Sequence, residues 1–433
     1  MRSESDSRLP EMKSFFKKMV VGVLKAEVRM ALLRFRPKIV AITGSVGKTS
    51  TKDAIACALA PFFSVRKSEK SYNSDFGIPL TILGLKNAAG NPILWLKNIF
   101  IGATRIFLEK KEPQWLVLEV GAGEPGDIAR FAQMLSPDIA VITRFAEVPV
   151  HVEFFASPEA VRKEKILLAR AVKEGGTLVL GSDDEKVAAL KNEFPDLHPM
   201  QYGVGEGGEV RGVGYQVEYE GGRPIGISFR VLVGTQSFPV SIKGVLGVHL
   251  IQPVLAAFAV VHSLGLDLAR AGEAFRDFKT PPGRMRLISG LNNSLIIDDS
   301  YNASPVAMRE ALATLASLET RGRKIAVLGG MAELGKFSAE EHRKVGELAL
   351  RSCDKLVLVG KLARGMTSDP TVAYFETSRE AADALVRDIR VDDVVLIKGS
   401  QSVRMERVVK ALMKEPECAK ELLVRQEWEW RDR

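Results

Sequence analysis

Short apolar runs alternate with helix-like segments through residues 37–180. Four of these runs have the length and composition of buried strands: "KIVAIT", "WLVLEVG", "DIAVIT" and "GTLVLG". Continuous apolar strands separated by helical segments are typical of a parallel sheet with helices on both faces. The pattern therefore predicts a parallel α/β unit in this part of the chain.

A second series of strand-like runs begins after residues 278–286, which read "FKTPPGRMR". It consists of "SLIIDDSY", "KIAVLGG", "KLVLVG" and "DVVLIKGS". Residues 201–245, ahead of this joint, are rich in glycine, valine and alternating polar positions, which predicts hairpins. We therefore expect a helical arm at 1–36, a parallel-sheet domain at 37–283 that contains the β-rich segment, and a Rossmann-like α/β domain at 284–433.

The arm is basic and has a helical apolar pattern. The first 40 residues carry ten Lys and Arg against four Asp and Glu, whereas all 433 residues together have a net charge of +8. The near-neutral remainder argues against a nucleic-acid-binding protein. Apolar residues recur every three or four positions at Met12, Phe16, Met19, Val23, Ala26, Met30 and Leu33. Such a helix can pack on its own domain, lie on an anionic membrane surface or pair with a second copy.

The most hydrophobic stretch is residues 91–108, "NPILWLKNIFIGATRIFL". Because it carries Lys97 and Arg105, we expect a buried helix rather than a membrane span. The three cysteines have no paired spacing, and the polar N-terminus does not resemble a signal peptide. These features indicate a reducing compartment and a cytoplasmic protein, without a disulfide framework or a zinc site.

One short stretch has the composition of a phosphate-binding loop. "TGSVGKTSTKD" follows the first apolar run and precedes a helix-like segment, and it contains the spacing G-x-x-G-K-T. A glycine turn before a helix start directs backbone N–H groups and the positive end of the helix dipole at one point, where a triphosphate can bind. An ordinary glycine-rich turn is the alternative interpretation. The candidate nucleotide-binding residues of this loop are Gly44, Ser45, Gly47, Lys48, Thr49 and Ser50.

Charged side chains at predicted strand ends are further candidates. Glu119 ends the run "WLVLE", where it could form a magnesium site with Thr49 or could simply face solvent. Asp298 ends another strand, before a turn that contains Asn302, and Arg284 lies at the joint between the two domains. Strand-end carboxylates and a basic residue at an α/β crevice are suited to binding a nucleotide.

The segment "HVEFFASPEAVRKEKILLA" contains two more candidates, His151 and Lys165. Ser157 can start a helix whose apolar stripe includes Val161. Lys165 has charged neighbours, so its spacing alone indicates a lysine exposed to solvent.

Eight blocks of the chain together resemble the Mur ligase family. In chain order they are "AITGSVGKTSTKD", "YNSDFGIPLTIL", "LVLEVGAGEPGDI", "HVEFF", "GRM", "IIDDSYNASPVAMREAL", "VLGGMAELG" and "VVLIKGS". The resemblance extends over roughly residues 37–410 and is greatest to the branch that adds D-alanyl-D-alanine to a UDP-linked muramoyl tripeptide. The blocks "IDDSYNASP" and "MAELG" are more specific than the phosphate loop.

The resemblance implies an ATP-dependent amide-bond ligase of peptidoglycan precursor synthesis. In that family ATP phosphorylates a substrate carboxylate, an amine attacks the acyl phosphate, and phosphate leaves. The implied partners are ATP with Mg²⁺, a peptide carboxylate such as a UDP-muramoyl peptide, and a D-alanyl-D-alanine-like amine. ATP and the substrate carboxylate are both anions, so cations must be concentrated where they meet. This explains why the candidate residues include charged side chains.

The resemblance also implies individual roles. Lys48 would hold the β- and γ-phosphates, and Thr49 with Glu119 would bind a first magnesium ion. His151 and a carbamylated Lys165 would hold a second magnesium ion. Carbamylation converts the lysine into a carboxylate-like ligand and reverses the interpretation from spacing. Neighbouring Lys163 is the competing assignment.

In the C-terminal region the resemblance implies contacts with both nucleotide and amine. Arg284 and Asp298 would reach the nucleotide. Tyr301, Asn302 and the "KGS" loop at residues 398–400 would carry the amine substrate.

The chain departs from the family pattern at three places. About 36 residues precede the first strand, where the family usually has a small domain that holds the UDP-linked sugar. The loop before His151 contains Arg144, and the two asparagines expected near the adenine are replaced at His249-Leu250 and Gln252-Pro253. The alternatives are therefore a folylpolyglutamate- or cyanophycin-type ligase, a ligase with a lipid-linked acceptor, and a nucleotide-binding scaffold without catalysis.

Overall fold

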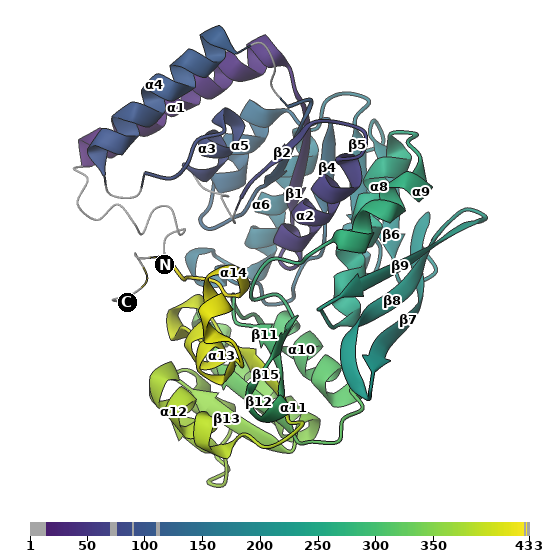
Figure 1. Cartoon of the computed structure of the whole chain (residues 1–433). Coiled ribbons are helices and arrows are strands. Elements are labelled where there is room, and N and C mark those ends of the chain that lie inside the picture. The colour runs from purple at the N-terminus through teal and green to yellow at the C-terminus, as the bar shows by residue number, and fades with distance from the viewer. Residues whose placement is uncertain (1–13, 70–75, 89–90, 110–112, 428–429, 431–433) are drawn as a thin grey trace.

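The computed structural model describes residues 14–69, 76–88, 91–109, 113–427 and 430. These residues form two α/β units, one above the other in Figure 1, each built around its own sheet. The first sheet has nine strands and is mainly parallel, and the second has six. The predicted fold class is confirmed.

The first sheet has a parallel part and an antiparallel extension. Its strand order is β2 (Val65–Lys67), β3 (Trp115–Glu119), β1 (Lys38–Thr43), β4 (Ile139–Ile142), β5 (Thr177–Gly181), β6 (His198–Gly203), β7 (Val210–Glu220), β8 (Arg223–Val233) and β9 (Gln236–Lys243). The strands from β2 to β7 pair in parallel, whereas β7, β8 and β9 form antiparallel hairpins. The register places Ile42 opposite Glu119, so the end of β3 lies beside the loop that follows β1.

Alternate residues of β1 enter two separate cores. Val40 and Ile42 pack in the core that contains α2 (Lys48–Leu59) and α8 (Ile251–Ser263). Ile39 and Ala41 pack in the core on the other face of the sheet. The helices of that second core are α1 (Ser14–Phe35), α3 (Gly77–Leu83), α4 (Pro92–Leu108), α5 (Asp127–Leu135), α6 (Pro158–Arg170) and α7 (Glu185–Ala188). Burial on both faces explains why these strands read as continuous apolar runs.

The second sheet follows α9 (Leu268–Glu273) and the joint. Its strand order is β10 (Arg286–Ser289), β11 (Leu295–Asp299), β15 (Val394–Lys398), β12 (Lys324–Gly329), β13 (Lys355–Val359) and β14 (Ala373–Phe375). All pairs are parallel except β10 with β11. The accompanying helices are α10 (Pro305–Ser317), α11 (Ser338–Ser352), α12 (Ser378–Asp388), α13 (Glu406–Leu412) and α14 (Ala419–Leu422).

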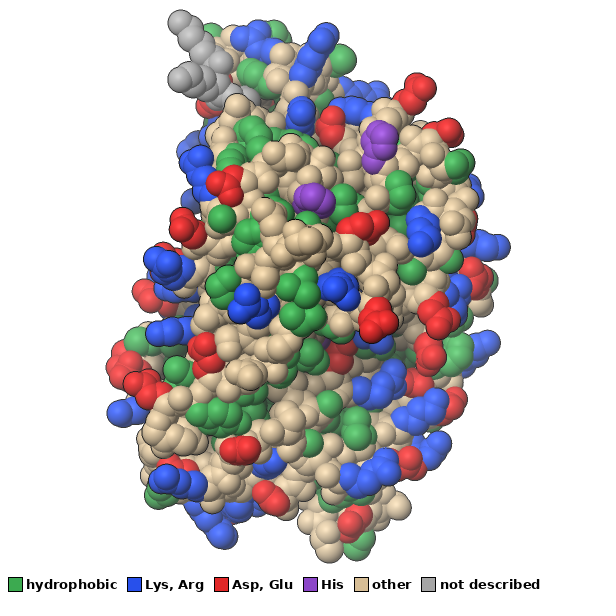
Figure 2. Space-filling view, turned by 90° about the vertical axis from the view of Figure 1, so that its right-hand side faces the viewer, with side chains coloured by type: hydrophobic (Ala, Val, Ile, Leu, Met, Phe, Trp, Pro, Cys, Tyr) green, Lys and Arg blue, Asp and Glu red, His purple; other side chains and the backbone are tan. Residues whose placement is uncertain are grey.

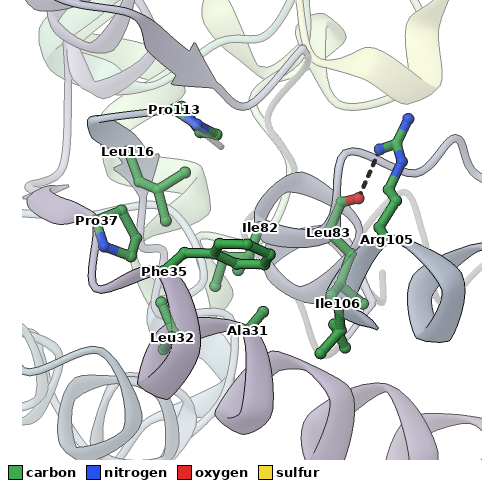
Figure 3. Close-up of a pocket in the computed structure, with 10 residues that line it drawn as sticks. All are labelled: Ala31, Leu32, Phe35, Pro37, Ile82, Leu83, Arg105, Ile106, Pro113 and Leu116. Carbon is green, nitrogen blue, oxygen red and sulfur yellow. Dashed lines mark hydrogen bonds between the residues drawn. The ribbon is translucent and has the colours of Figure 1, made fainter. Parts of the chain in front are cut away.

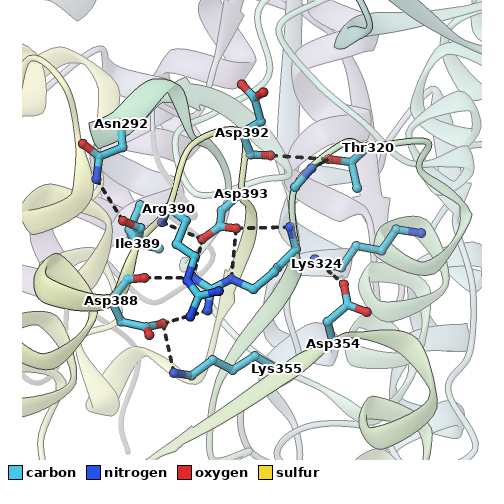
Figure 4. A network of polar contacts seen from close by, with 12 residues as sticks. Asn292, Thr320, Lys324, Asp354, Lys355, Asp388, Ile389, Arg390, Asp392 and Asp393 are labelled. Atoms are coloured by element: carbon cyan, nitrogen blue, oxygen red, sulfur yellow. Dashed lines mark hydrogen bonds and ion pairs between the residues drawn. The ribbon is translucent and has the colours of Figure 1, made fainter.

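A polar network that includes Lys355, Asp388 and Asp393 holds the starting ends of the strands in the second sheet (Figure 4). Arg323, just before β12, donates to Asp393, just before β15, from Nε (3.1 Å) and Nη2 (2.6 Å). Lys355 Nζ donates to Asp388 Oδ2 at 2.9 Å, and the Asn292 side chain donates to the carbonyl of Ile389 at 2.8 Å. These ties lie at the amino ends of the parallel strands, so the carboxyl ends, where ligands bind in such sheets, lie at the opposite edge.

Helices α1 and α4 lie side by side at the far end of the first unit (Figure 1). The predicted helix at residues 91–108 is present, but α4 buries only Trp95, Asn98, Gly102 and Ile106, so the prediction that it is a buried helix is wrong. The sequence places apolar residues on every side of this helix, but only one stripe of them packs against the first unit. No helix among the described residues is both long and apolar enough to cross a membrane.

Most of the apolar stripe predicted for the arm is not on the side of α1 that packs, although Phe16 of that stripe contacts the core. Val20, Leu24 and Val28 are fully buried, whereas Met30 and Leu33 of the predicted stripe are exposed. Met12 lies outside the described residues. α1 therefore has apolar side chains on two sides and uses the unpredicted side to join the core.

The C-terminal end of α1 packs tightly against the first sheet and its neighbouring helices. A small apolar cavity there is lined by Phe35, Ile82 and Leu116, among others (Figure 3). Its volume is about 20 Å³, little more than one water-sized probe occupies. Arg105 Nη1 closes one side by donating to the carbonyl of Leu83 at 2.7 Å. The cavity is too small to serve as a ligand site.

Candidate active site

The loop between β1 and α2 takes a conformation that requires its glycines. Gly44 and Gly47 have φ angles of 145° and 83°. A Cβ added at Gly44 would lie 2.0 Å from Thr143 Oγ1. α2 begins at Lys48, and no side chain caps its first turn. The start of a helix without a side-chain cap, next to a glycine turn, is a favourable place for a phosphate group.

Two lysines contact this loop. Lys48 Nζ donates to the carbonyl of Gly44 at 3.0 Å, and Lys165 Nζ donates to Ser45 Oγ at 2.8 Å. Burial lowers the pKa of Lys48, partly offset by the Glu119 carboxylate. Burial and the charge of Lys48 lower the pKa of Lys165 well below the ordinary lysine value. Both causes disfavour the charged form of Lys165, because a second ammonium would be desolvated beside the first.

The interpretation of Lys165 as a solvent-exposed lysine is wrong. Its residue is 4% exposed, and it lies on the inner side of α6 with Val161 and Leu168. The neighbouring Lys163 is exposed. Charged neighbours in the sequence misled the prediction, since those side chains lie on the other sides of the helix.

Thr49 and Glu119 form a pair of oxygen donors beside the loop. Thr49 Oγ1 donates to Glu119 Oε2 at 2.8 Å, and both residues are buried. The register of β1 and β3 produces this contact. A carboxylate with a hydroxyl is a donor set that suits Mg²⁺, which commonly combines one or two carboxylates with phosphate oxygens and water. The residues present therefore fit a magnesium ion.

His151 lies where the two units meet. Its Nδ1 is 2.5 Å from Glu333 Oε2, which belongs to the loop after β12. Both residues have positive φ, 69° for His151 and 64° for Glu333. Arg144, in the loop before His151, also crosses between the units, with Nη1 2.8 Å from Glu310 Oε1 on α10. The second unit thus contacts the first through the His151–Glu333 pair and through the Arg144–Glu310 ion pair.

A cavity of about 520 Å³ lies between the units, within the size range of small-molecule sites. Its lining residues include Gly47, Ser50, Thr143, Arg144, Asp183, Asp184, His249, Gln252, Arg284, Asp299, Glu310 and Lys398. The phosphate loop therefore forms one wall of the cavity, and the carboxyl ends of β11 and β15 form another.

The first unit contributes two carboxylates to this cavity that sequence analysis missed. Asp183 accepts hydrogen bonds from the backbone N–H of Val204 (3.0 Å) and of Gly205 (3.0 Å), and from the Gln252 side chain. Asp184 caps α7 and accepts from the N–H of Phe145 at 2.7 Å. The sequence signal was available, since both follow the run "GTLVLG" at a strand end.

On the second unit the cavity is lined by Asp299, whereas the predicted Asp298 is completely buried on the other side of β11. Consecutive strand residues face opposite sides of a sheet. Burial raises the pKa of Asp298 to about 6, although the N–H of Ser300 donates to its Oδ1 at 3.1 Å. Asp299 Oδ2 instead accepts from Lys398 Nζ at 2.6 Å, and Lys398 also donates to the carbonyl of Asn302 at 2.9 Å. Lys398 thereby fixes the Asn302 backbone next to the cavity.

The turn after β11 is held between two arginines. The Arg284 guanidinium lies 4.1 Å from the centre of the Tyr301 ring, and that of Arg425 lies 5.6 Å from it. Arg425 also donates from Nη1 to the carbonyl of Ser300 at 3.2 Å and to Glu406 Oε2 at 3.1 Å. No motif marked Arg425, since its partners lie far from it in the sequence. The C-terminal segment is therefore part of the support of the site.

Two family profiles match the chain. The Mur ligase middle domain matches residues 42–261, and the glutamate ligase domain of Mur ligases matches residues 283–401. The first match alone includes more than half of the chain.

Individual relatives agree with these profiles. The chain is 27% identical over 388 residues to the UDP-N-acetylmuramoyl-tripeptide--D-alanyl-D-alanine ligase of Bacillus subtilis, covering 88% of this chain and 76% of the relative. It is 31% identical over 410 residues to the enzyme of that name from Mycobacterium tuberculosis, covering 88% and 74%. The crystal structure of the MurF ligase from Thermotoga maritima in complex with ADP superposes with a TM-score of 0.76 at 29% identity, covering 92% of this chain and 84% of that one.

Proposed function

Because this chain belongs to the Mur ligase family, we propose that it joins D-alanyl-D-alanine to the peptide carboxylate of a UDP-linked muramoyl tripeptide at the expense of ATP. It is an ATP-dependent acid–amino-acid ligase. The observation that carries the proposal is the cavity between the units, whose walls are the phosphate loop and the carboxyl ends of β11 and β15.

The reaction brings together two negatively charged groups, the acceptor carboxylate and the γ-phosphate of ATP. The acceptor carboxylate attacks the γ-phosphate of ATP, which forms an acyl phosphate and ADP. The amine nitrogen then attacks the acyl carbon, and phosphate leaves as the amide bond forms. Cationic groups fixed at the meeting point stabilise both steps.

Lys48 is proposed to bind the β- and γ-phosphates. Its contact with Gly44 places the ammonium within the loop. The loop residues Gly44, Ser45, Gly47, Thr49 and Ser50 are proposed to hold the phosphates through backbone N–H and hydroxyl groups. On the second unit we propose Arg284 and Asn302 as nucleotide contacts. For Asp298 we propose an indirect role through the Ser300 turn, since Asp299 faces the cavity.

Magnesium would be held by Thr49 and Glu119 and by His151 with Lys165. When bound, it neutralises phosphate charge and polarises the γ-phosphoryl group. Glu333 competes for His151 in the structure described, so separation of that pair would free the imidazole for the metal.

Lys165 is proposed to act as a carbamate. Carbon dioxide reacts with a neutral amine, and the burial and neighbouring charge that lower the pKa of Lys165 favour that form over the ammonium. The resulting anion would lie close to the Lys48 ammonium, where opposite charges attract. This chemistry is compatible with a lysine that is buried beside a second lysine.

We propose the acceptor from the two sequence relatives described above, whereas the amine is assigned to a place in the structure. The chain covers 74% to 76% of the two sequence relatives described above. The amine is assigned to the second unit, where Lys398 and the Asn302 turn lie at the cavity. A folylpolyglutamate- or cyanophycin-type ligase would use the same acyl-phosphate chemistry with another amine, and a scaffold would bind nucleotide without turnover.

We further propose that the enzyme is cytoplasmic and peripheral to the inner face of the membrane, with α1 contributing to the contact. The basic arm and the free thiols of all three cysteines support this location.

The proposed function predicts that phosphate release from ATP depends on the amine. With a UDP-linked muramoyl tripeptide present, D-alanyl-D-alanine should stimulate release, whereas L-alanyl-L-alanine and L-glutamate should not. Activity should rise from neutral to mildly alkaline pH, because the attacking amine must be unprotonated. A phosphate-release assay with each amine measures this. Stimulation by L-glutamate would favour the folylpolyglutamate-type reaction, and the absence of phosphate release with every amine would favour the scaffold.

A further inference from the structure

Helices α1 and α4 carry an unusual share of the exposed apolar side chains. Seventeen large apolar residues are exposed among the described residues, and nine of them lie on these two helices. They are Met19, Met30, Leu33, Ile93, Leu94, Leu96, Phe100, Phe107 and Leu108. We call these nine residues the α1–α4 apolar surface. Concentration of this kind marks an interaction surface rather than scattered exposure.

The outer side of α4 is the centre of this surface. Ile93, Leu96, Phe100 and Phe107 recur at intervals of three, four and seven residues, so they share one side of the helix. Their exposed fractions range from 53% to 76%. The buried residues of α4 occupy the other side. A surface helix normally turns polar residues outward, so α4 is built to face a second apolar medium.

The two helices are held together as one body. Glu27 of α1 lies against Gly102 of α4, where a Cβ would lie 2.4 Å from Glu27 Oε2. Arg34 donates to the carbonyl of Phe107 at 3.5 Å, so the C-terminal ends of both helices are adjacent. α1 is anchored by its buried side in the core of the first unit. The apolar surface is therefore fixed to the enzyme by packing.

The charges on the two helices are mostly basic, and Glu109, which follows α4, pairs with Arg105 at 3.4 Å. Lys18, Arg29, Arg34 and Lys97 are exposed on the two helices. Within the helices themselves, residues 14–35 and 92–108, Glu27 is the only acidic residue, and burial raises its pKa to about 7. Elsewhere acidic and basic side chains are interspersed, as on the face shown in Figure 2. A partner with an apolar interior and an anionic surface complements this combination.

We propose that the α1–α4 apolar surface docks the enzyme on an anionic lipid bilayer, with α4 as the principal contact. Exposed Phe and Leu would enter the boundary between headgroups and acyl chains, and the lysines and arginines would lie among anionic headgroups. The helices lie on the membrane, since none of those described can span it. This proposal goes beyond the ligase activity, which a soluble assay measures independently.

Vesicle flotation with the full chain tests the proposal. We expect binding to phosphatidylcholine vesicles that contain phosphatidylglycerol, little binding to phosphatidylcholine alone, and loss of binding as salt is added. The double variant Phe100→Ser/Phe107→Ser should weaken binding about tenfold or more. Arg29→Glu/Lys97→Glu should weaken it to a similar degree at low salt.

A matched control tests whether binding depends on the α1–α4 apolar surface or on any exposed apolar residue. Leu362→Ser/Val391→Ser changes two exposed apolar residues of the second unit, which are 48% and 66% exposed, and should leave binding unchanged. All variants should retain ligation in solution, which shows that they fold. No binding to anionic vesicles, or equal binding by the α4 variant, would overturn the proposal. A concentration-dependent dimer that only the α4 variant abolishes would assign the surface to a second copy and would overturn it as well.

Discussion

The variant Lys48→Ala should bind ATP about a hundredfold more weakly, a loss of about 3 kcal/mol, because a buried charge-assisted contact with phosphate is removed. The fold should survive, since Lys48 contacts the Gly44 carbonyl and closes no apolar core. The variant also removes the charge of Lys48, which partly lowers the pKa of Lys165, so the pKa of Lys165 should rise. Calorimetric titration with ATP and Mg²⁺ measures the affinity.

The matched control for this variant is Lys361→Ala, which removes an exposed lysine of the second unit. It should bind ATP as the unaltered enzyme does, and thermal unfolding should show that both variants are folded. Unchanged ATP affinity in Lys48→Ala would mean that the loop is an ordinary strand–helix turn.

The variant Lys165→Ala should lose ligation by a factor of about a hundred to a thousand, the range seen when one group that stabilises transition-state charge is removed. ATP binding should change little, because Lys48, Thr49 and Glu119 remain in place. If a carbamate is responsible, the unaltered enzyme should lose activity in buffer depleted of carbon dioxide and regain it with bicarbonate. Amide formation and ATP affinity are measured on the same preparations.

Lys163→Ala is the control for this prediction, since Lys163 is exposed on the same helix. It should retain ligation. The reverse result, with an active Lys165→Ala and an inactive Lys163→Ala, would transfer the proposed role to Lys163. Activity that is indifferent to carbon dioxide while Lys165→Ala is inactive would reject the carbamate and leave the unmodified lysine side chain as the required group.

The sequence predicted the parts of the fold that depend on local pattern. Parallel strands buried on both faces leave continuous apolar runs, so the two sheets could be recognised before any contact was known. The phosphate loop was identified from its glycines and lysine. Glu119 was predicted as a site residue from the rule that ligands gather beyond the carboxyl ends of parallel strands. In the structure Thr49 and Glu119 share a hydrogen bond.

Other features depended on information that local pattern does not contain. Asp298 and Asp299 are adjacent, and only knowledge of the side on which the cavity lies shows that Asp299 faces it. The burial of Lys165 depends on which side of α6 meets the loop. Glu333 and Arg425 act across the joint or from the far end of the chain. Each of these contacts is set by tertiary structure.

The helical pair shows the same limit. Both α1 and α4 have more apolar residues than one packing side needs, so the sequence could not tell the buried stripe from the exposed one. The excess is itself informative once the structure is known, because a helix with two apolar sides has a second partner to meet.

The transfer of carboxylate oxygen to phosphate tests the acyl-phosphate ligase most directly. The acceptor carboxylate is labelled with oxygen-18, and the acceptor is incubated with ATP, Mg²⁺ and D-alanyl-D-alanine. The masses of the products are then measured by mass spectrometry. We expect one labelled oxygen in each released phosphate, together with ADP and an equal amount of amide product. Unlabelled phosphate, or label recovered in AMP, would contradict an acyl-phosphate mechanism in this enzyme.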